Sequence, residues 1–308
     1  MTLPGLTAQY VDYAKWQRDR LNSPVIQNQV SYWKSQLSGT NGIIYPRSAD
    51  DSIKNRGKAH TTRFSLSSEQ SVALKKYCES NELTPYMLLL SSFYLLLNTA
   101  TQKTDIAVTS PIANRTHPEI EHLIGYFVNT LVLRVDLSKT AKVEELIALV
   151  KKTTLDAQAN QDVPFDYLIG QLELAEETTS SLLQTRFVMQ NIMTRFPMVS
   201  DFDYDFVEVN TKTAKFDLMF TVYENNGTYT GAIEYRKDVF SDNAIDDYIK
   251  GYLSAVDYLL NVERDSPLDT HKIRATLDQQ KLHRKKSTTK RFGDKLSKLK
   301  SKRLRKEA

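Results

Sequence analysis

The chain has 308 residues, enough for one large domain or two ordinary ones, and its 41% hydrophobic and 25% charged residues are typical of a globular protein with a sizeable core. A single cysteine excludes a disulfide framework. The net charge of +4 is unevenly spread: residues 270–308 hold fifteen Lys and Arg against three acids, a net of +12, so residues 1–269 carry −8.

The N-terminus has neither the basic region nor the apolar region of a signal peptide. The most apolar run, YMLLLSSFYLLL, has 12 residues with two serines among them, too few to span a bilayer. We therefore expect a cytoplasmic protein without a membrane span.

The first half of the chain is predicted to be mainly helical. Residues 6–37 read as helical, with Trp16 and Trp33 as large anchors, and a short strand at 61–66 precedes a helix at 69–81. Thr84 as N-cap and Pro85 at the first helical position begin the next helix. Since this helix is apolar on nearly every side, we expect it to be central and buried.

The second half alternates strands with helices. Strands are predicted at 105–112 and 131–137, separated by a polar turn at 113–119, and an amphipathic helix follows, with Val143, Leu146, Ile147 and Val150 on its apolar face. Period-two patterns predict late strands at 185–193, 215–224 and 228–236, the last two joined by an ENNG turn, and a final helix at 242–260. The pattern predicts an α/β (mixed α+β) fold, a mixed sheet packed with helices.

The residue types and their spacing do not by themselves identify a catalytic or binding site. The five histidines are scattered, so no metal site is predicted, and neither a phosphate-binding glycine loop nor a G-x-S-x-G motif occurs.

Four stretches, taken in order, resemble the later core motifs of nonribosomal peptide synthetase condensation domains: YVDYAKWQ (10–17), IGYFVNTLVLR (124–134), NQDVPFDYLI (160–169) and RFVMQN (186–191). The resemblance implies a chloramphenicol-acetyltransferase-like lobe, one of two that enclose a tunnel. It also implies that two carrier proteins insert phosphopantetheine arms there as substrates, and that an amine on one arm attacks a thioester carbonyl on the other.

The family's catalytic motif, HHxxxDG, lies in the first lobe, and this sequence contains no HH pair. The chain therefore resembles only the C-terminal lobe, at residues 1–265, followed by a basic linker or tail at 266–308. Deleting residues 270–308 should leave the thermal unfolding of the body nearly unchanged. No catalytic residue is assigned, and an N-terminal lobe in cis or trans would be needed. The alternative is an inactive carrier-docking or structural remnant; no directly bound cofactor, metal or nucleic acid is expected.

The resemblance makes Gly125, Phe127, Asn129, Gln190 and Asn191 candidates for lining the tunnel. Gly125 would permit a close backbone approach, and Phe127 with its neighbour Val128 would anchor the turn in the core. Asn129 would present its amide to the reaction chamber, or would only cap a turn locally.

Other motif residues are expected to be structural. Tyr10, Tyr13 and Trp16 share a helical face and should pack in the core, with Asp12 as an ion-pair partner or cap. A structural salt bridge is expected for Arg134.

The NQDVPF motif is interpreted as the end of a helix. Pro164 would terminate that helix and Phe165 would pack under the turn. Gln161 and Asp162 could hold the loop near the tunnel.

Overall fold

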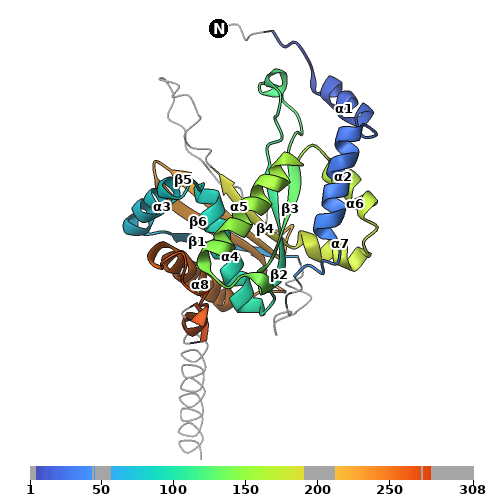
Figure 1. Ribbon diagram of the computed structural model, residues 1–308. Helices are drawn as coiled ribbons and strands as arrows, with labels where there is room; N and C mark the ends of the chain where they lie inside the picture. Colours follow the sequence, from blue (N-terminus) through green and yellow to red (C-terminus); the bar gives the residue numbers. More distant parts are fainter. Residues whose placement is uncertain (1–4, 44, 46–56, 191–211, 272, 279–308) are drawn as a thin grey trace, which may run out of the picture.

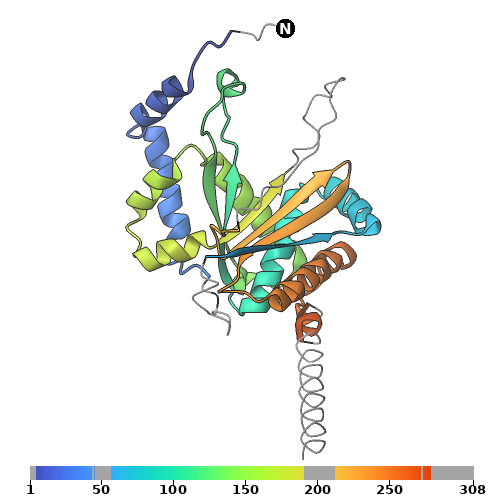
Figure 2. The same cartoon turned by 180° about the vertical axis from the view of Figure 1, so that it is seen from behind.

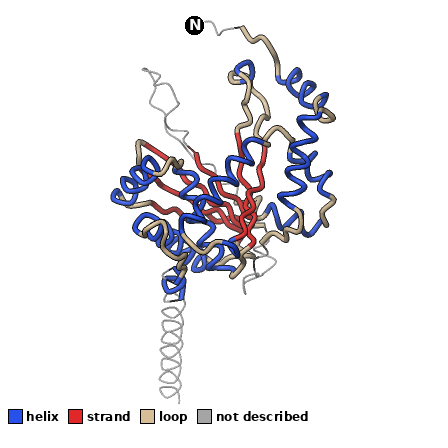
Figure 3. The backbone as a smooth tube through the Cα atoms, in the orientation of Figure 1, coloured by secondary structure: helices blue, strands red, loops and turns tan. Residues whose placement is uncertain are grey.

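The computed structural model describes residues 5–43, 45, 57–190, 212–271 and 273–278. Within them, six strands form one sheet in the order β1-β6-β5-β4-β2-β3. The pairs β2–β4 and β4–β5 are parallel and the others antiparallel, so the predicted mixed sheet is confirmed. Figure 3 shows the strands gathered in one sheet with helices around it. The strands are β1 (Ala59–Ser65), β2 (Asp105–Ile112), β3 (Asn129–Asp136), β4 (Thr185–Gln190), β5 (Leu218–Asn225) and β6 (Thr228–Arg236).

One face of the sheet carries a layer of helices (Figure 1). This layer consists of α3 (Ser68–Ser80), α4 (Pro85–Thr101), α5 (Val143–Ala159) and α8 (Asp242–Asn261). Helix α4 is the central one, as its all-round apolarity predicts, and the side chain of Thr84 accepts a hydrogen bond from the Met87 N–H at its start. The Phe93 ring of α4 lies 5.4 Å from Phe187 and 5.0 Å from Phe220, so the main core is aromatic at its centre.

The opposite face is covered only at one edge. Helix α7 (Glu176–Leu183) contacts β2 and β4, α6 (Phe165–Leu172) contacts β3, and α2 (Pro24–Leu37) packs on α6. In the described part of the chain no helix covers β1, β6 or β5 on this face (Figure 2). One row of that face holds Arg186, Met219 and Glu234 side by side.

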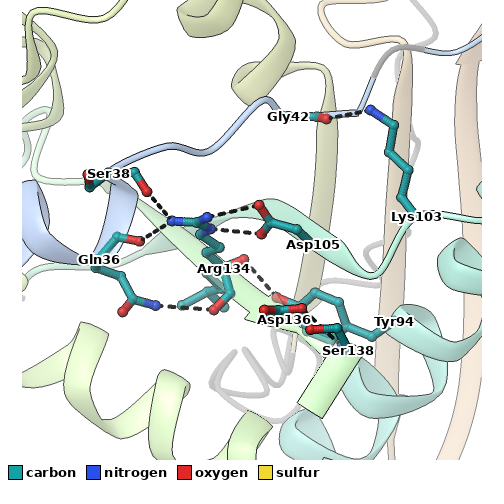
Figure 4. Close-up of polar contacts among 10 residues, drawn as sticks. Gln36, Ser38, Gly42, Tyr94, Lys103, Asp105, Arg134, Asp136 and Ser138 are labelled. Atoms are coloured by element: carbon teal, nitrogen blue, oxygen red, sulfur yellow. Dashed lines mark hydrogen bonds and ion pairs between the residues drawn. The ribbon is translucent and has the colours of Figure 1, made fainter. Parts of the chain in front are cut away.

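Arg134 fixes β3 to the end of α2 (Figure 4). Its guanidinium donates two hydrogen bonds to the Asp105 carboxylate, at 2.7 and 2.9 Å, and its Nη1 donates to the carbonyls of Gln36 and Ser38. The Gln36 amide donates back to the Arg134 carbonyl at 3.1 Å. The predicted structural salt bridge is confirmed, and it joins three elements.

Three boundaries differ from the sequence expectations. The N-terminal helical region is two helices, α1 (Tyr10–Asp19) and α2, because Ser23 caps a new helix that begins at Pro24. Strand β3 begins at Asn129, two residues before the predicted start. Pro164 does not end the preceding helix: α5 ends at Ala159, and Pro164 is the N-cap residue of α6.

Packing continues beyond residue 265, where the tail was expected to begin. Ile273 is 0% exposed and Leu277 is 5% exposed. The Leu268 N–H donates to the Ala141 carbonyl at 2.8 Å, and the Val143 N–H donates to the Ser266 carbonyl. This segment is therefore attached to the start of α5, and its two buried side chains are part of the body.

No single helix among the described residues is long and apolar enough to cross a bilayer. Helices α3 and α4 pass that test only together, bent by 112° at their junction.

Candidate functional site

The carboxyl ends of the parallel strands lie together at one edge of the sheet. Since β2, β4 and β5 are parallel to one another through β4, their carboxyl ends at Ile112, Gln190 and Asn225 lie at the same edge. In open α/β sheets ligands bind outside the carboxyl ends of the strands. β3 begins at this edge, with Asn129 paired to Ile112.

Asn129 holds two segments of the chain together at this edge. Its side chain is 8% exposed, and its Nδ2 donates to the carbonyls of Gln161 and Val163, at 2.8 and 2.7 Å. Its Oδ1 accepts from the N–H groups of Thr130 and Phe165, at 2.9 and 3.0 Å. All four hydrogen-bonding positions of the amide are thus used within the chain. The tunnel-lining role of Asn129 stays a prediction, but three of its four hydrogen bonds are made with the NQDVPF segment at 160–165.

Helix α2 holds the same loop from the other side. The Gln29 amide donates to the Asp162 carboxylate at 3.0 Å and accepts from the Asp162 N–H at 3.1 Å. The indole of Trp33, 2% exposed, donates to the Asn160 carbonyl at 2.8 Å. Phe165 is partly buried and packs against the main core. The NQDVPF loop is therefore fixed between β3 and α2.

The segment between β2 and β3 forms a second, small apolar cluster with α1. The cluster consists of Tyr13, Ile120, Leu123 and Phe127, with Tyr10 packed against it. A Cβ added at Gly125 would lie 2.3 Å from Cδ2 of Tyr10, which agrees with the expected close backbone approach. Phe127 is an anchor, as predicted.

Arg115 braces this segment, and the sequence analysis missed it. Its guanidinium lies 4.2 Å from the centre of the Phe127 ring and donates to the carbonyls of Ile120, Glu121 and Leu123. Arg115 lies in a stretch that reads as a polar surface turn. Its only sequence signal is an arginine close to an exposed apolar motif, which is too weak to identify it.

The same segment exposes large apolar side chains. Ile124 is 97% exposed, Tyr126 79% and Val128 45%. The expectation that Val128 anchors the turn is wrong, because the chain alternates here and places Phe127 inward and its two neighbours outward.

The helical motif at the N-terminus is structural in part. The Asp12 carboxylate accepts a hydrogen bond from the Gln9 N–H at 2.9 Å, which confirms the predicted cap. Tyr13 is buried, but Trp16 is 39% exposed and lies between the His117 ring, with ring centroids 5.2 Å apart, and the guanidinium of Arg20. The predicted core packing of Trp16 is wrong, because it packs on the outside of the small cluster.

Part of the last motif lies on the face of the sheet opposite α4. Gln190 and Arg186 alternate with the core residue Phe187 along β4, so their side chains leave the sheet on the face opposite α4. The Arg186 guanidinium lies 4.9 Å from the Phe216 ring centre, and burial lowers its pKa. Asn191 lies outside the described residues. No group of His, Cys, Asp and Glu in the described chain has the arrangement of a metal site.

Comparisons with known proteins agree with the motif resemblance. The sequence profile of the condensation domain matches residues 1–282. The chain is 35% identical over 271 residues to a polypeptide of the linear gramicidin synthase of Brevibacillus parabrevis, a match that covers 84% of this chain and 5% of that protein. It is 32% identical over 251 residues to phosphinothricin tripeptide synthetase PhsC of Streptomyces viridochromogenes, covering 79% of this chain and 23% of PhsC. The chain thus spans a small part of these relatives.

Solved structures share the fold. The condensation domain of the monacolin K polyketide synthase MokA matches with a TM-score of 0.71 at 18% identity, over 87% of this chain and 64% of that one. SgcC5 from Streptomyces globisporus matches with a TM-score of 0.71 at 20% identity, over 87% of this chain and 62% of that one. The predicted chloramphenicol-acetyltransferase-like fold is confirmed.

Proposed function

This chain belongs to the condensation domain family, and we propose that it forms the C-terminal lobe of an amide-forming domain in nonribosomal peptide synthesis. The observation that carries the proposal is the contact between motifs that lie far apart in the sequence. Three motifs distant in sequence contact one another at the start of β3 and in the connection that precedes it: Tyr10 packs on Gly125, and Asn129 donates a hydrogen bond to the carbonyl of Gln161. Asn129 lies at the carboxyl edge of the parallel strands, where open α/β sheets bind ligands, and this position supports the proposal.

In the proposed reaction two carrier proteins bring their phosphopantetheine-bound acyl groups to this edge. The acceptor nitrogen bonds to the donor carbonyl carbon, the carbon–sulfur bond breaks, and the donor's thiol leaves with the proton that the nitrogen gives up. Holding the two reactants in attack geometry supplies much of the acceleration, and one group must manage the proton. We assign that group to a first lobe that carries HHxxxDG, in cis or in trans, because this sequence has no HH pair.

Within this proposal the five candidates keep unequal roles. Gly125, Phe127 and Asn129 shape the wall by fixing the segments around it, and Gln190 extends it at the end of β4. Asn191 keeps the role that the motif resemblance gives it. Asn129 acts through the NQDVPF loop, since its own amide is fully bonded. The first lobe would cover the exposed Ile124 and Tyr126, because exposed apolar side chains of this kind mark interaction sites.

The test is reconstitution. Donor- and acceptor-loaded carriers are incubated with this chain alone, with a separately produced first lobe alone, and with both, and the amide product is detected by mass spectrometry. We expect product only with both. A first lobe whose second motif histidine is replaced by alanine is the matched control.

Product from this chain alone would overturn the proposal. Carrier binding without product, with every matched first lobe, would instead favour the inactive docking remnant. The missing HH pair is the observation behind that alternative.

A further inference from the structure

The small apolar cluster around Phe127 is separate from the main core. Among the described residues, the main core contains none from the segments 5–19 and 113–128. Strand pairing between β2 and β3 ends at Ile112 and Asn129, so the connection leaves the sheet beyond this pair. The connection and α1 project beyond the end of the sheet on the same side (Figures 1 and 2). Since a separate cluster holds a local unit together, these two segments can open while the main core stays packed.

Polar contacts join the two segments to one another. The Tyr10 hydroxyl donates to the Tyr126 carbonyl at 3.0 Å, and the Asn114 amide donates to the Tyr13 hydroxyl at 3.3 Å. Arg115 donates to three carbonyls inside the connection and so keeps its backbone in one conformation. A movement of α1 together with the connection keeps all these contacts, whereas a movement of either segment alone breaks the first two.

A pocket with many polar side chains lies between this unit and the rest of the protein. The unit and the turn that follows α1 line it with Tyr13, Trp16, Gln17, Arg20, Asn114 and Thr116, and the body lines it with Ile26 and Asp162. Five of these eight residues have polar or charged side chains. Separation at this boundary therefore breaks fewer apolar contacts than separation within the main core would, and its free energy is correspondingly lower.

We propose that residues 5–19 and 113–128 form a lid that opens as one unit at the carboxyl edge of the sheet. Its hinges are the turn at 20–23, between α1 and α2, and the two ends of the connection beside Ile112 and Asn129. The structure shows the closed lid.

Opening changes the shape of the candidate site. Gly125 and Phe127 belong to the lid, whereas Asn129 is bonded to the NQDVPF loop and stays with the body. The lid therefore moves two of the wall candidates relative to the third. This movement goes beyond the proposed reaction and does not require it.

Hydrogen exchange of the full chain, followed by mass spectrometry, measures the opening. We expect peptides from 10–19 and 120–127 to exchange at similar opening free energies and faster than peptides from α4. Phe127→Leu weakens the cluster and should speed exchange in both segments by the same factor, on the order of tenfold. Tyr13→Leu, on the other segment, should have the same effect on both.

Ile147→Ala is the matched control, because Ile147 is 1% exposed and lies in the main core. This variant should lower the melting temperature of the body and leave exchange in the lid unchanged.

The two tryptophans give a second measurement that needs no destabilising variant. Trp16 lies in the lid beside His117 and Arg20, and Trp33 is buried in α2 of the body. In a chain labelled with fluorotryptophan each gives its own fluorine resonance, and Trp16→Phe identifies the two. We expect the Trp16 resonance to change at a lower urea concentration than the Trp33 resonance.

A single transition shared by both tryptophans would overturn the proposal, as would exchange in the lid no faster than in α4. A response to Phe127→Leu that is confined to the connection, with α1 unchanged, would show that the two segments do not open as one unit. Neither product formation nor its absence in the reconstituted enzyme alters these readouts, so the lid and the proposed function fail separately.

Discussion

At the scale of single residues, replacing Asn129 by the similarly shaped aspartate should disrupt several buried hydrogen bonds. Asn129→Asp keeps an acceptor for the Thr130 and Phe165 N–H groups but turns both donors into an oxygen that faces the carbonyls of Gln161 and Val163. A buried charge facing acceptors is strongly unfavourable, so we expect the free energy of unfolding to fall by roughly 3 kcal/mol. Denaturant titration at neutral pH measures it.

The control for this change is Asn226→Asp, in the exposed β5–β6 turn, which should alter stability by less than about 0.5 kcal/mol. The deficit of Asn129→Asp should narrow as the pH is lowered, because protonation removes the buried charge and restores one donor. A deficit that is absent, or that is the same at pH 4 and pH 7, would contradict the assigned hydrogen bonds.

Gly125 is a second residue whose substitution has a definite steric consequence. Gly125→Ala brings a methyl group to within 2.3 Å of the Tyr10 ring, so the ring or the segment must move. We expect a loss of about 1–3 kcal/mol, as for other overpacked sites. Thermal unfolding measures the loss, and Tyr10→Ala in the same chain should recover part of it.

Gly170→Ala is the matched control, because nothing lies within 4 Å of a Cβ at that helical position. Alanine is the better helix former there, so stability should rise by up to about 1 kcal/mol. Equal effects at the two glycines would show that Tyr10 does not pack against Gly125.

At the scale of elements, Arg134 joins β2, β3 and α2, and its geometry needs a guanidinium. Arg134→Lys keeps the charge but cannot bind the Asp105 carboxylate with two nitrogens while also reaching two carbonyls at the end of α2. We expect a loss of about 1.5–3 kcal/mol and faster amide hydrogen exchange in the last turn of α2.

Arg264→Lys is the comparison, since the guanidinium of the exposed Arg264 donates to Oδ1 of Asn81 and does not bridge several elements. It should cost less than about 0.5 kcal/mol. Unchanged exchange in α2 after Arg134→Lys would mean that backbone packing alone holds the helix to the sheet.

At the scale of the whole molecule, the body extends past the point where sequence composition places the tail. Ile273 and Leu277 are buried, so a chain that ends at Asp265 should melt at a lower temperature than one that ends at Asp278. Ile273→Ala alone should cost about 2–5 kcal/mol. The expectation that residues from 270 onward can be removed without effect is replaced by this one.

Val72→Ala, at a side chain that is 69% exposed, controls for a change of the same kind outside the core and should leave the melting temperature nearly unchanged. Equal melting temperatures for the two truncated chains would show that residues 266–278 do not contribute to the body.

The sequence could predict elements whose signals are local. Thr84 followed by Pro85 indicated the start of α4, and the ENNG turn indicated the β5–β6 hairpin, because both depend on the backbone preferences of neighbouring residues. The split between α1 and α2 also had a local signal in Ser23 and Pro24, but the helical pattern on both sides concealed it. The partners of Arg115 and the extra packing of Ile273 had no such signal, since both depend on contacts that only the folded chain makes.

The sequence by itself determined the class of fold and, through four ordered motifs, the family. The periodicity of apolar residues and the order of the motifs can be read from the sequence alone, because they reflect which residues must be buried and which segments must pack together. Only the tertiary structure decided what those motif residues do. In the folded chain the Asn129 amide is hydrogen-bonded to the NQDVPF loop, and Val128 points outward. A cavity without charged lining residues lies beside Ile112. A side chain's partners and exposure are set by segments that lie far away in sequence, and burial makes each unmet hydrogen bond or empty space costly, so these roles follow from the packed chain alone.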